Sequence, residues 1–204
     1  MSSMILSGDT SGAITVSAPA VAGTNTITLP AATGTVVVAG ANSAITAGTA
    51  VASTSGTSID FTGIPSWVKR ITVMFNAVSS NGTGNFQVQL GTASSVEITS
   101  YTGAGGVMAN GASTSAFNST TGFAIYNGGN VYNIYGNATI CLLDPSTNLW
   151  AFSFSGANGN TANVLASGGT KALSGVLTRL RVIASATGSP SDTFDGGSIN
   201  ILYE

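Results

Sequence analysis

The amino-acid sequence predicts an all-β protein, in which a short-strand N-terminal segment is followed by an antiparallel β-sandwich domain of the jelly-roll kind. Two observations favour it: apolar and polar residues alternate in short runs, and tight-turn sequences separate those runs. A third is the lack of helical pattern, since glycine or proline interrupts every stretch with a 3.6-residue apolar period. Short strands joined by hairpins indicate a sandwich rather than a βαβ fold.

Each expected strand has one apolar face. In the first, Ile71, Val73, Phe75 and Ala77 alternate with Arg70, Thr72, Met74 and Asn76, as in a strand with one face on a core. The segments with this pattern are residues 70–77, 86–90, 150–155, 179–184 and 199–203. The sequence therefore predicts half-buried strands at these places.

Turn sequences of defined chemistry lie between the strands. Asn81-Gly82, Asn158-Gly159 and Asp195-Gly196-Gly197 tolerate the positive φ that tight hairpins require. Asp144 precedes Pro145, which is a further turn position. These sequences favour antiparallel hairpins.

The composition changes near residue 56. Residues 1–55 contain no aromatic residue and one charged residue, Asp9, and their expected β-branched strands are residues 12–17, 24–30 and 33–38. Burial of apolar surface stabilises by about 25 cal/mol per Å², so strands with few large side chains gain little by themselves. We therefore predict an attachment or intertwining segment at residues 1–55, which pairs with other copies or another protein, and a β-sandwich domain at residues 56–204.

The chain has no histidine, and charged residues make up 6% of it, against roughly a quarter in average soluble domains. Without histidine there is no Ser-His-Asp or Cys-His pair and no imidazole metal ligand. We expect a non-enzymatic protein without cofactor or metal. So little charge favours a chain built into an assembly, because mixed surface charge keeps free proteins apart in solution. The alternative is a monomer solubilised by Ser, Thr and Asn.

Other partner classes are disfavoured by the same composition. The five basic residues never cluster beyond a pair, which argues against nucleic acid. No apolar run approaches the roughly 18–20 residues of a membrane span, and the start lacks a basic, secretory-type leader. Cys141, the single cysteine, fits folding in a reducing cytoplasm and is expected to be a small buried apolar residue.

Two groups of residues remain as candidate sites. Asp192 and Asp195 could form a carboxylate pair of the glycosidase type or offer two ligands to calcium, but structural roles in turns are favoured for them. The second group combines aromatic faces with amides, as sugar-binding surfaces do, and is a candidate for surface recognition. It consists of Tyr126, Tyr132, Tyr135, Asn130 and Asn133. The alternative is that these tyrosines pack on neighbouring strands.

Three segments carry a resemblance to a known kind of protein. Residues 7–36 (SGDTSGAITVSAPAVAGTNTITLPAATGTV) resemble a stretch near the N-terminus of tailed-bacteriophage virion proteins of the tail-fibre kind. Residues 59–75 (IDFTGIPSWVKRITVMF) and 194–204 (FDGGSINILYE) are similar to a C-terminal domain of such proteins. The resemblance implies a homotrimeric β appendage of the virion, assembled in the bacterial cytoplasm.

The same resemblance implies the partners. The N-terminal strands would hold a tail, baseplate or major capsid protein, and the C-terminal domain would project and contact a host surface glycan or protein. Because the sequence has no heptad run or extended repeat for a shaft, a capsid decoration protein of the cement or head-fibre type is the alternative. A polysaccharide-degrading tailspike is a third, disfavoured by the lack of β-helix periodicity.

Overall fold

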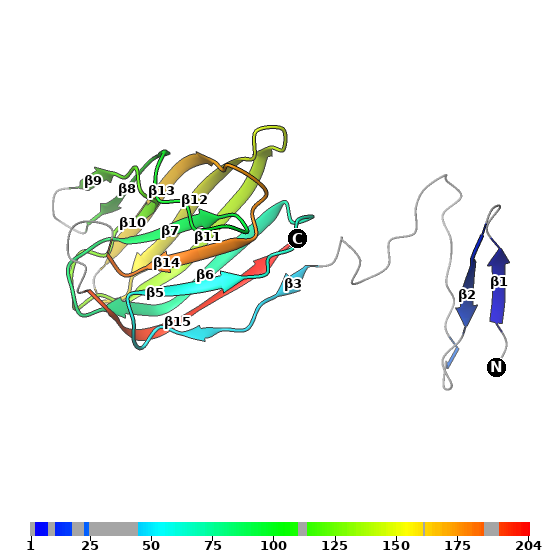
Figure 1. Cartoon of the computed structure of the whole chain (residues 1–204). Helices are drawn as coiled ribbons and strands as arrows, with labels where there is room; N and C mark the ends of the chain where they lie inside the picture. The colour runs from blue at the N-terminus through cyan, green and yellow to red at the C-terminus, as the bar shows by residue number, and fades with distance from the viewer. Residues whose placement is uncertain are drawn as a thin grey trace. The chain divides into compact units, whose positions relative to one another are not determined.

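The computed structural model describes residues 3–7, 11–17, 23–24, 45–109, 114–160, 162–185 and 192–204. Within these residues every regular element is a β-strand, and the strands pair antiparallel (Figure 1). The described residues contain no helix of the length and apolarity that a membrane crossing needs. The predicted all-β, antiparallel fold class is confirmed. The chain divides into two compact units, Met1–Val36 and Val37–Glu204.

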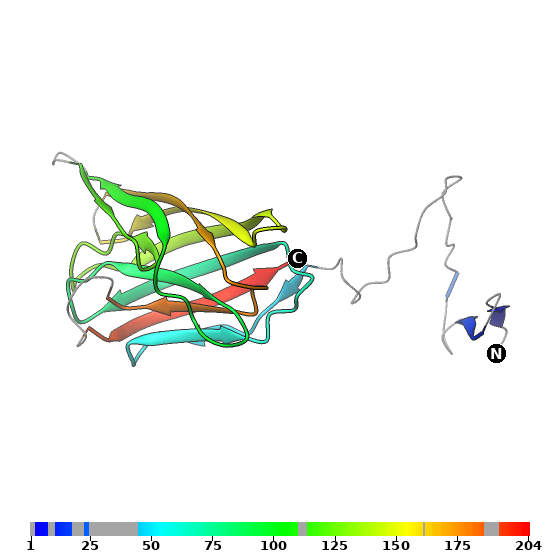
Figure 2. The ribbon, with the colours of Figure 1, turned by 45° about the horizontal axis from the view of Figure 1, so that its top comes forward.

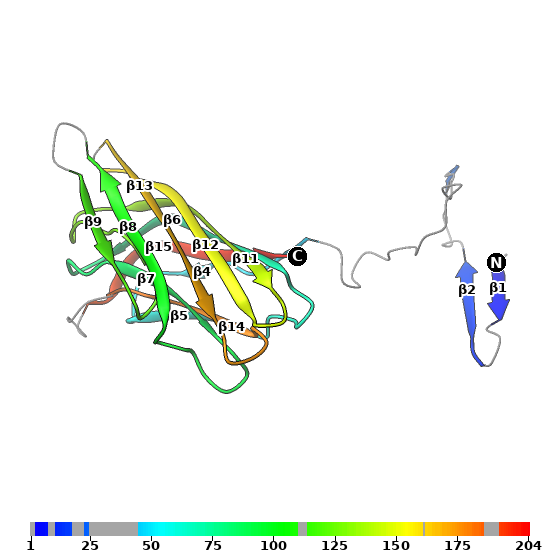
Figure 3. The ribbon, with the colours of Figure 1, turned by 90° about the horizontal axis from the view of Figure 1, so that it is seen from above.

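The larger unit consists of two sheets. The small sheet has the order β10-β7-β14-β5, and its strands are β5 (Ser58–Thr62), β7 (Phe86–Gly91), β10 (Phe123–Ile125) and β14 (Arg179–Ile183). The large sheet has the order β3-β15-β6-β11-β12-β13-β8-β9, and β4 also pairs with β15. Its strands are β3 (Thr46–Ala47), β4 (Val51–Ala52), β6 (Arg70–Ser80), β8 (Tyr101–Met108), β9 (Ser115–Asn118), β11 (Ile134–Asp144), β12 (Leu149–Asn158), β13 (Asn163–Ala172) and β15 (Phe194–Tyr203). Figure 3 shows the two layers from above.

The order of pairing is nested, as in a jelly roll. The antiparallel pairs β6–β15, β7–β14, β8–β13 and β11–β12 enclose one another along the chain. Figure 2 shows the outermost pair, with the red β15 alongside the teal β6. The chain crosses repeatedly between the sheets, since β5, β7, β10 and β14 of the small sheet are each preceded and followed along the chain by strands of the large sheet. The innermost pair, β11–β12, stays in the large sheet, which explains why that sheet is so wide.

Aromatic side chains join the two sheets. Phe123 of the small sheet stacks on Phe152 of the large sheet with ring centroids 4.4 Å apart, and Tyr101 meets Phe123 edge-on at 5.0 Å. Phe86 packs on Phe194 at 5.6 Å between the same two layers. All five are buried, so each contributes apolar area on the order of 150–250 Å² to the core. The core therefore lies between the sheets, as a sandwich requires.

The alternation in β6 ends at a bulge. Ile71, Val73 and Phe75 are buried as predicted, but Ala77 has φ of 52° and Val78 takes the next core position. The pairing of β15 with β6 shifts register twice here, and Gly197 has φ of 89°. The prediction of a turn at residues 195–197 is wrong, because a β-bulge uses the same positive-φ glycine inside a strand.

The division of the chain lies elsewhere than at the predicted boundary between residues 55 and 56. β3 and β4 precede that boundary, yet both pair with β15 of the large sheet, and the units divide between Val36 and Val37. The change in composition near residue 56 comes after the division between the two units, because the short edge strands β3 and β4 need few large side chains. Edge position, rather than a separate unit, accounts for the small residues at 45–55.

The N-terminal unit contains a hairpin of β1 (Ser3–Ser7) and β2 (Ala13–Ser17), so the predicted strand over residues 12–17 is confirmed. The expected strands at residues 24–30 and 33–38 lie outside the described residues, apart from Thr24. Leu6 and Val16 are 53% and 50% exposed, and Ile5 is exposed as well. A two-stranded hairpin is marginally stable by itself, because it leaves its apolar side chains in water.

Candidate recognition surface

Two of the predicted recognition tyrosines meet at one glycine. Tyr126 follows β10 and Tyr132 precedes β11, and the loop between them turns at Gly128, where φ is 81°. A Cβ atom at Gly128 would lie 2.8 Å from the rings of both Tyr126 and Tyr132. Phe117 of β9 extends the cluster, with its ring centroid 6.2 Å from that of Tyr126. A glycine at position 128 is therefore what lets the two rings approach.

The other predicted residues form a second group around the β12–β13 turn. Tyr135 lies over Gly159, where a Cβ would be 2.4 Å from its ring, and Tyr135 is 40% exposed. Asn133 donates a weak hydrogen bond to the side-chain oxygen of Asn160 at 3.4 Å, and its carbonyl accepts from the Gly159 N–H at 2.9 Å. The Asn160 side chain in turn donates to the carbonyl of Val131.

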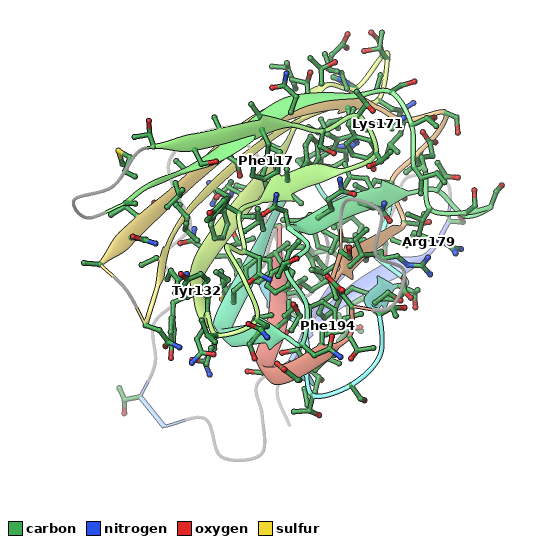
Figure 4. All side chains as sticks on the ribbon, turned by 90° about the vertical axis from the view of Figure 1, so that its left-hand side faces the viewer. Phe117, Tyr132, Lys171, Arg179 and Phe194 are labelled. Carbon is green, nitrogen blue, oxygen red and sulfur yellow. The ribbon has the colours of Figure 1, made fainter. Side chains whose placement is uncertain are left out.

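The structure thus groups Tyr126 with Tyr132, and Tyr135 with Asn133, while Asn130 is exposed on the loop between β10 and β11. Tyr126 also packs against the hydrophobic core, which is the structural role that the sequence left as the alternative. Figure 4 shows Tyr132 and the basic Arg179 on opposite sides of the view. The exposed amides and ring faces could make hydrogen bonds and stacking contacts with an uncharged ligand such as a sugar.

Asp144, Asp192 and Asp195 each accept hydrogen bonds from a different partner. Asp144 caps its own turn: one oxygen accepts the Ser146 N–H at 2.8 Å and the Ser146 hydroxyl at 2.7 Å. These hydrogen bonds, with another from Thr147, lower the pKa of Asp144 below its ordinary value. The predicted turn role of Asp144 is confirmed.

Asp192 and Asp195 have separate partners. Buried Asp192 accepts the Gly84 N–H at 2.9 Å and so ties its loop to the loop after β6. Asp195 accepts the Ser79 hydroxyl at 2.5 Å across the bulge. Among the described residues no group of three or more His, Cys, Asp or Glu side chains could hold a metal ion.

A buried ion pair was not predicted. Lys171 of β13 is buried, and its Nζ lies 2.6 Å from Oε2 of Glu97 and 5.4 Å from the ring centroid of Tyr101. Ser174 donates to the other Glu97 oxygen through its N–H at 2.9 Å and its hydroxyl at 2.6 Å. One feature of the sequence could have indicated the burial of Lys171: it is an even number of residues from the buried Leu165, so both side chains lie on the same face of the strand.

These contacts change the titration of both acidic groups. Burial alone would raise the pKa of Glu97, but the hydrogen bonds from Lys171 and Ser174 outweigh it and hold this pKa below its ordinary value. Burial raises the pKa of Tyr101 well above the usual range, so it stays protonated. Its hydroxyl donates to the Glu97 carbonyl at 2.9 Å and accepts from the Leu90 N–H at 2.7 Å. The cluster therefore fastens the loop before β8 to the sandwich.

The small sheet carries charge on its outward side. Arg181 of β14 makes two hydrogen bonds to Asp60 of β5, at 2.7 and 3.0 Å, and that contact raises the pKa of Arg181. Arg179 donates to the Ala93 carbonyl at 2.7 Å. Cys141 of β11 is only half-buried, which corrects the expectation of a buried residue, because its parity turns it away from the core.

Comparisons with protein-family models, with curated proteins and with solved structures found no match to this chain.

Proposed function

We propose that this chain is a non-enzymatic structural component of a bacteriophage virion: a trimeric, fibre-type appendage. The N-terminal segment anchors it to the particle, and the sandwich projects from the particle. The observation that carries the proposal is the hairpin β1–β2, a small unit that leaves Ile5, Leu6 and Val16 exposed. Because such a hairpin gains stability when another protein covers it, it is suited to attachment.

Two features of the sequence support the same proposal. A net charge of −2 and the scarcity of charged residues suit a chain whose surface is covered in an assembly. Residues 7–36 resemble the N-terminal stretch of tail-fibre proteins, and they include β2 of the hairpin. A virion component repeated on a particle requires paired strands and apolar contacts between copies, but no titrating groups.

Substitution in the hairpin tests the anchor. Leu6→Asp places a charge on the exposed apolar side chain and should remove the protein from purified particles, while Ser7→Asp, one residue away and also exposed, should be incorporated normally. Incorporation is measured by quantitative mass spectrometry of the particles, and circular dichroism checks that both variants are folded. The anchor is refuted if Leu6→Asp is incorporated at the wild-type copy number, and the virion assignment if the wild-type chain is absent from particles.

Capsid decoration is the second candidate function. It is favoured by the compact sandwich of the larger unit, since the sequence offers no repeat from which a long shaft could be built. Immunogold labelling separates the two candidates, because a decoration protein covers the head and a fibre labels the tail. Heat release of the genome on deletion of the gene would favour decoration.

Contact with the host surface is assigned to the tyrosine–asparagine groups near Tyr132 and Tyr135. Both rings are partly exposed, and neither belongs to the buried core. Tyr132→Ala combined with Tyr135→Ala should weaken binding of the protein to host cells at least tenfold, about the loss expected of two aromatic contacts. Thr62→Ala, at an exposed position on β5 of the small sheet, serves as the control. Unchanged binding by the folded double variant would remove these residues from the site.

A further inference from the structure

The large sheet has an outer face that no other described part of the larger unit covers. We define the outer face as the outward side chains of β15, β6, β11, β12, β13 and β8, the central six strands in Figure 1. The cross-strand register arranges them in rows. Two rows cross all six strands: Leu202–Thr72–Thr139–Ser153–Gly168–Ala104, and Asn200–Met74–Asn137–Ser155–Ala166–Gly106. Eight of these twelve residues are Gly, Ala, Ser or Thr, so most of the side chains on the face are small.

The outer face carries almost no charge. A third row, beside the first, ends in Arg70 and Glu204, which form a salt bridge with each other, and continues through Cys141, Ala151 and Thr170 to Thr102. The outward side of the small sheet, by contrast, holds Asp60, Arg179 and Arg181. Asp144 of β11 and Asp195 of β15 lie at opposite ends of the outer face, so the rows between them contain no charge other than the Arg70–Glu204 pair.

One end of the outer face is apolar. Tyr135, Ala157, Val164 and Met108 are aligned across β11, β12, β13 and β8, and all four are exposed. Beside this row lies a hollow of about 220 Å³, whose lining includes Met108, Val164 and Ala116. Met108 is 57% exposed, an unusual position for an unbranched apolar side chain in a chain this poor in surface charge.

We infer that the outer face, apart from Tyr135 at the end of its apolar row, is the surface through which copies of this chain associate. Strands about 4.8 Å apart and rows about 6.8 Å apart give it dimensions of roughly 29 by 27 Å, or about 780 Å². A standard protein interface takes about 800 Å² from each partner, so the face is large enough for one stable contact. The inference names the surface of self-association and does not depend on where in a virion the protein resides.

A second copy fits the face better than a charged partner does. Contacts between identical chains bring like charges together, and the central rows of the face limit that repulsion because their charged couple, Arg70–Glu204, is paired internally. Small Ser, Ala and Gly side chains lose little conformational entropy on contact and let flat sheets approach closely.

An arginine in the centre of the face tests the inference in the full-length chain. Ser155→Arg and, in another row, Ala157→Arg both change exposed outward positions, while Thr62→Arg places the same side chain on the small sheet. Light scattering after gel filtration measures the mass. The labelling rate of Cys141 by a maleimide reports directly on the face, because this half-buried thiol is the single cysteine.

The expected result has two parts. Wild type and Thr62→Arg should be oligomeric with slow labelling of Cys141, and both face variants should label about tenfold faster or more and lose oligomeric mass. The inference is overturned if the face variants keep both the wild-type mass and the wild-type labelling rate, or if the wild type is a monomer. Absence of the protein from virions would refute the proposed function while leaving these outcomes unchanged.

Discussion

Replacing Glu97 by Gln should destabilise the sandwich more than replacing Lys171 by Met. The side chain of Lys171 is 4% exposed and that of Glu97 17%, and their charged atoms are 2.6 Å apart. In Glu97→Gln the ammonium group remains buried without a counter-charge, for which we expect a loss of about 3–5 kcal/mol in the free energy of unfolding.

In Lys171→Met the carboxylate of Glu97 remains, and it is better solvated and hydrogen-bonded than the ammonium that remains in Glu97→Gln. Glu97 is more exposed and keeps both hydrogen bonds from Ser174, while methionine preserves much of the apolar stem of lysine. We expect a loss of about 1–2 kcal/mol. The double variant should be more stable than Glu97→Gln alone, because it removes the unpaired charge.

Urea unfolding followed by tryptophan fluorescence measures these differences, since Trp150 pairs with Lys171 across β12 and β13. The four proteins form a double-mutant cycle, in which the coupling energy should exceed about 1.5 kcal/mol. Additive effects, or a larger loss of stability in Lys171→Met than in Glu97→Gln, would refute the reasoning that the buried Lys171 ammonium needs the counter-charge of Glu97.

Three further predictions concern stability. Phe152→Ala removes the ring stacked on Phe123 and should cost about 3–5 kcal/mol in urea unfolding, while Ser153→Ala on the exposed side should stay within about 0.5 kcal/mol; similar losses would contradict the placement of the core. Gly197→Ala should cost more than about 1 kcal/mol, because φ is 89° and the new Cβ would lie 2.3 Å from a carbonyl oxygen; Gly168→Ala, with its nearest atom at 3.6 Å, is the control. The lowered pKa of Glu97 contributes stability that is complete above its unfolded pKa of about 4.5 and is lost as the pH falls through the lower folded pKa. The urea concentration at the unfolding midpoint should therefore decrease when the pH is lowered below about 4.5. This decrease should be smaller in the double variant of Glu97 and Lys171, which lacks the carboxylate.

The site was only partly predictable from sequence. The residues Tyr126, Tyr132 and Tyr135 are close in the chain, which made one cluster the natural expectation. The glycines at 128 and 159 divide them, because the rings of Tyr126 and Tyr132 lie against Gly128 and the ring of Tyr135 lies against Gly159. The pairing of Glu97 with Lys171 could not be foreseen, since the two residues come from a loop and a strand that only the nested topology brings together.

Sequence alone determined the class of fold and many of the inward residues of the strands. The half-buried strand predicted at residues 86–90 was wrong, because Gln87 and Gln89 of β7 are buried as well and hydrogen-bond to Thr121. Alternation with a period of two is a local property, and it identified Ile71, Val73 and Phe75 before any neighbour was known. Tertiary structure decided what depends on distant pairing: the bulge that absorbs Asp195-Gly196-Gly197 into β15, and the inclusion of β3 and β4 in the large sheet. It also decided that small, uncharged residues from six strands share one outer face, because register across a sheet is fixed between segments and not within them.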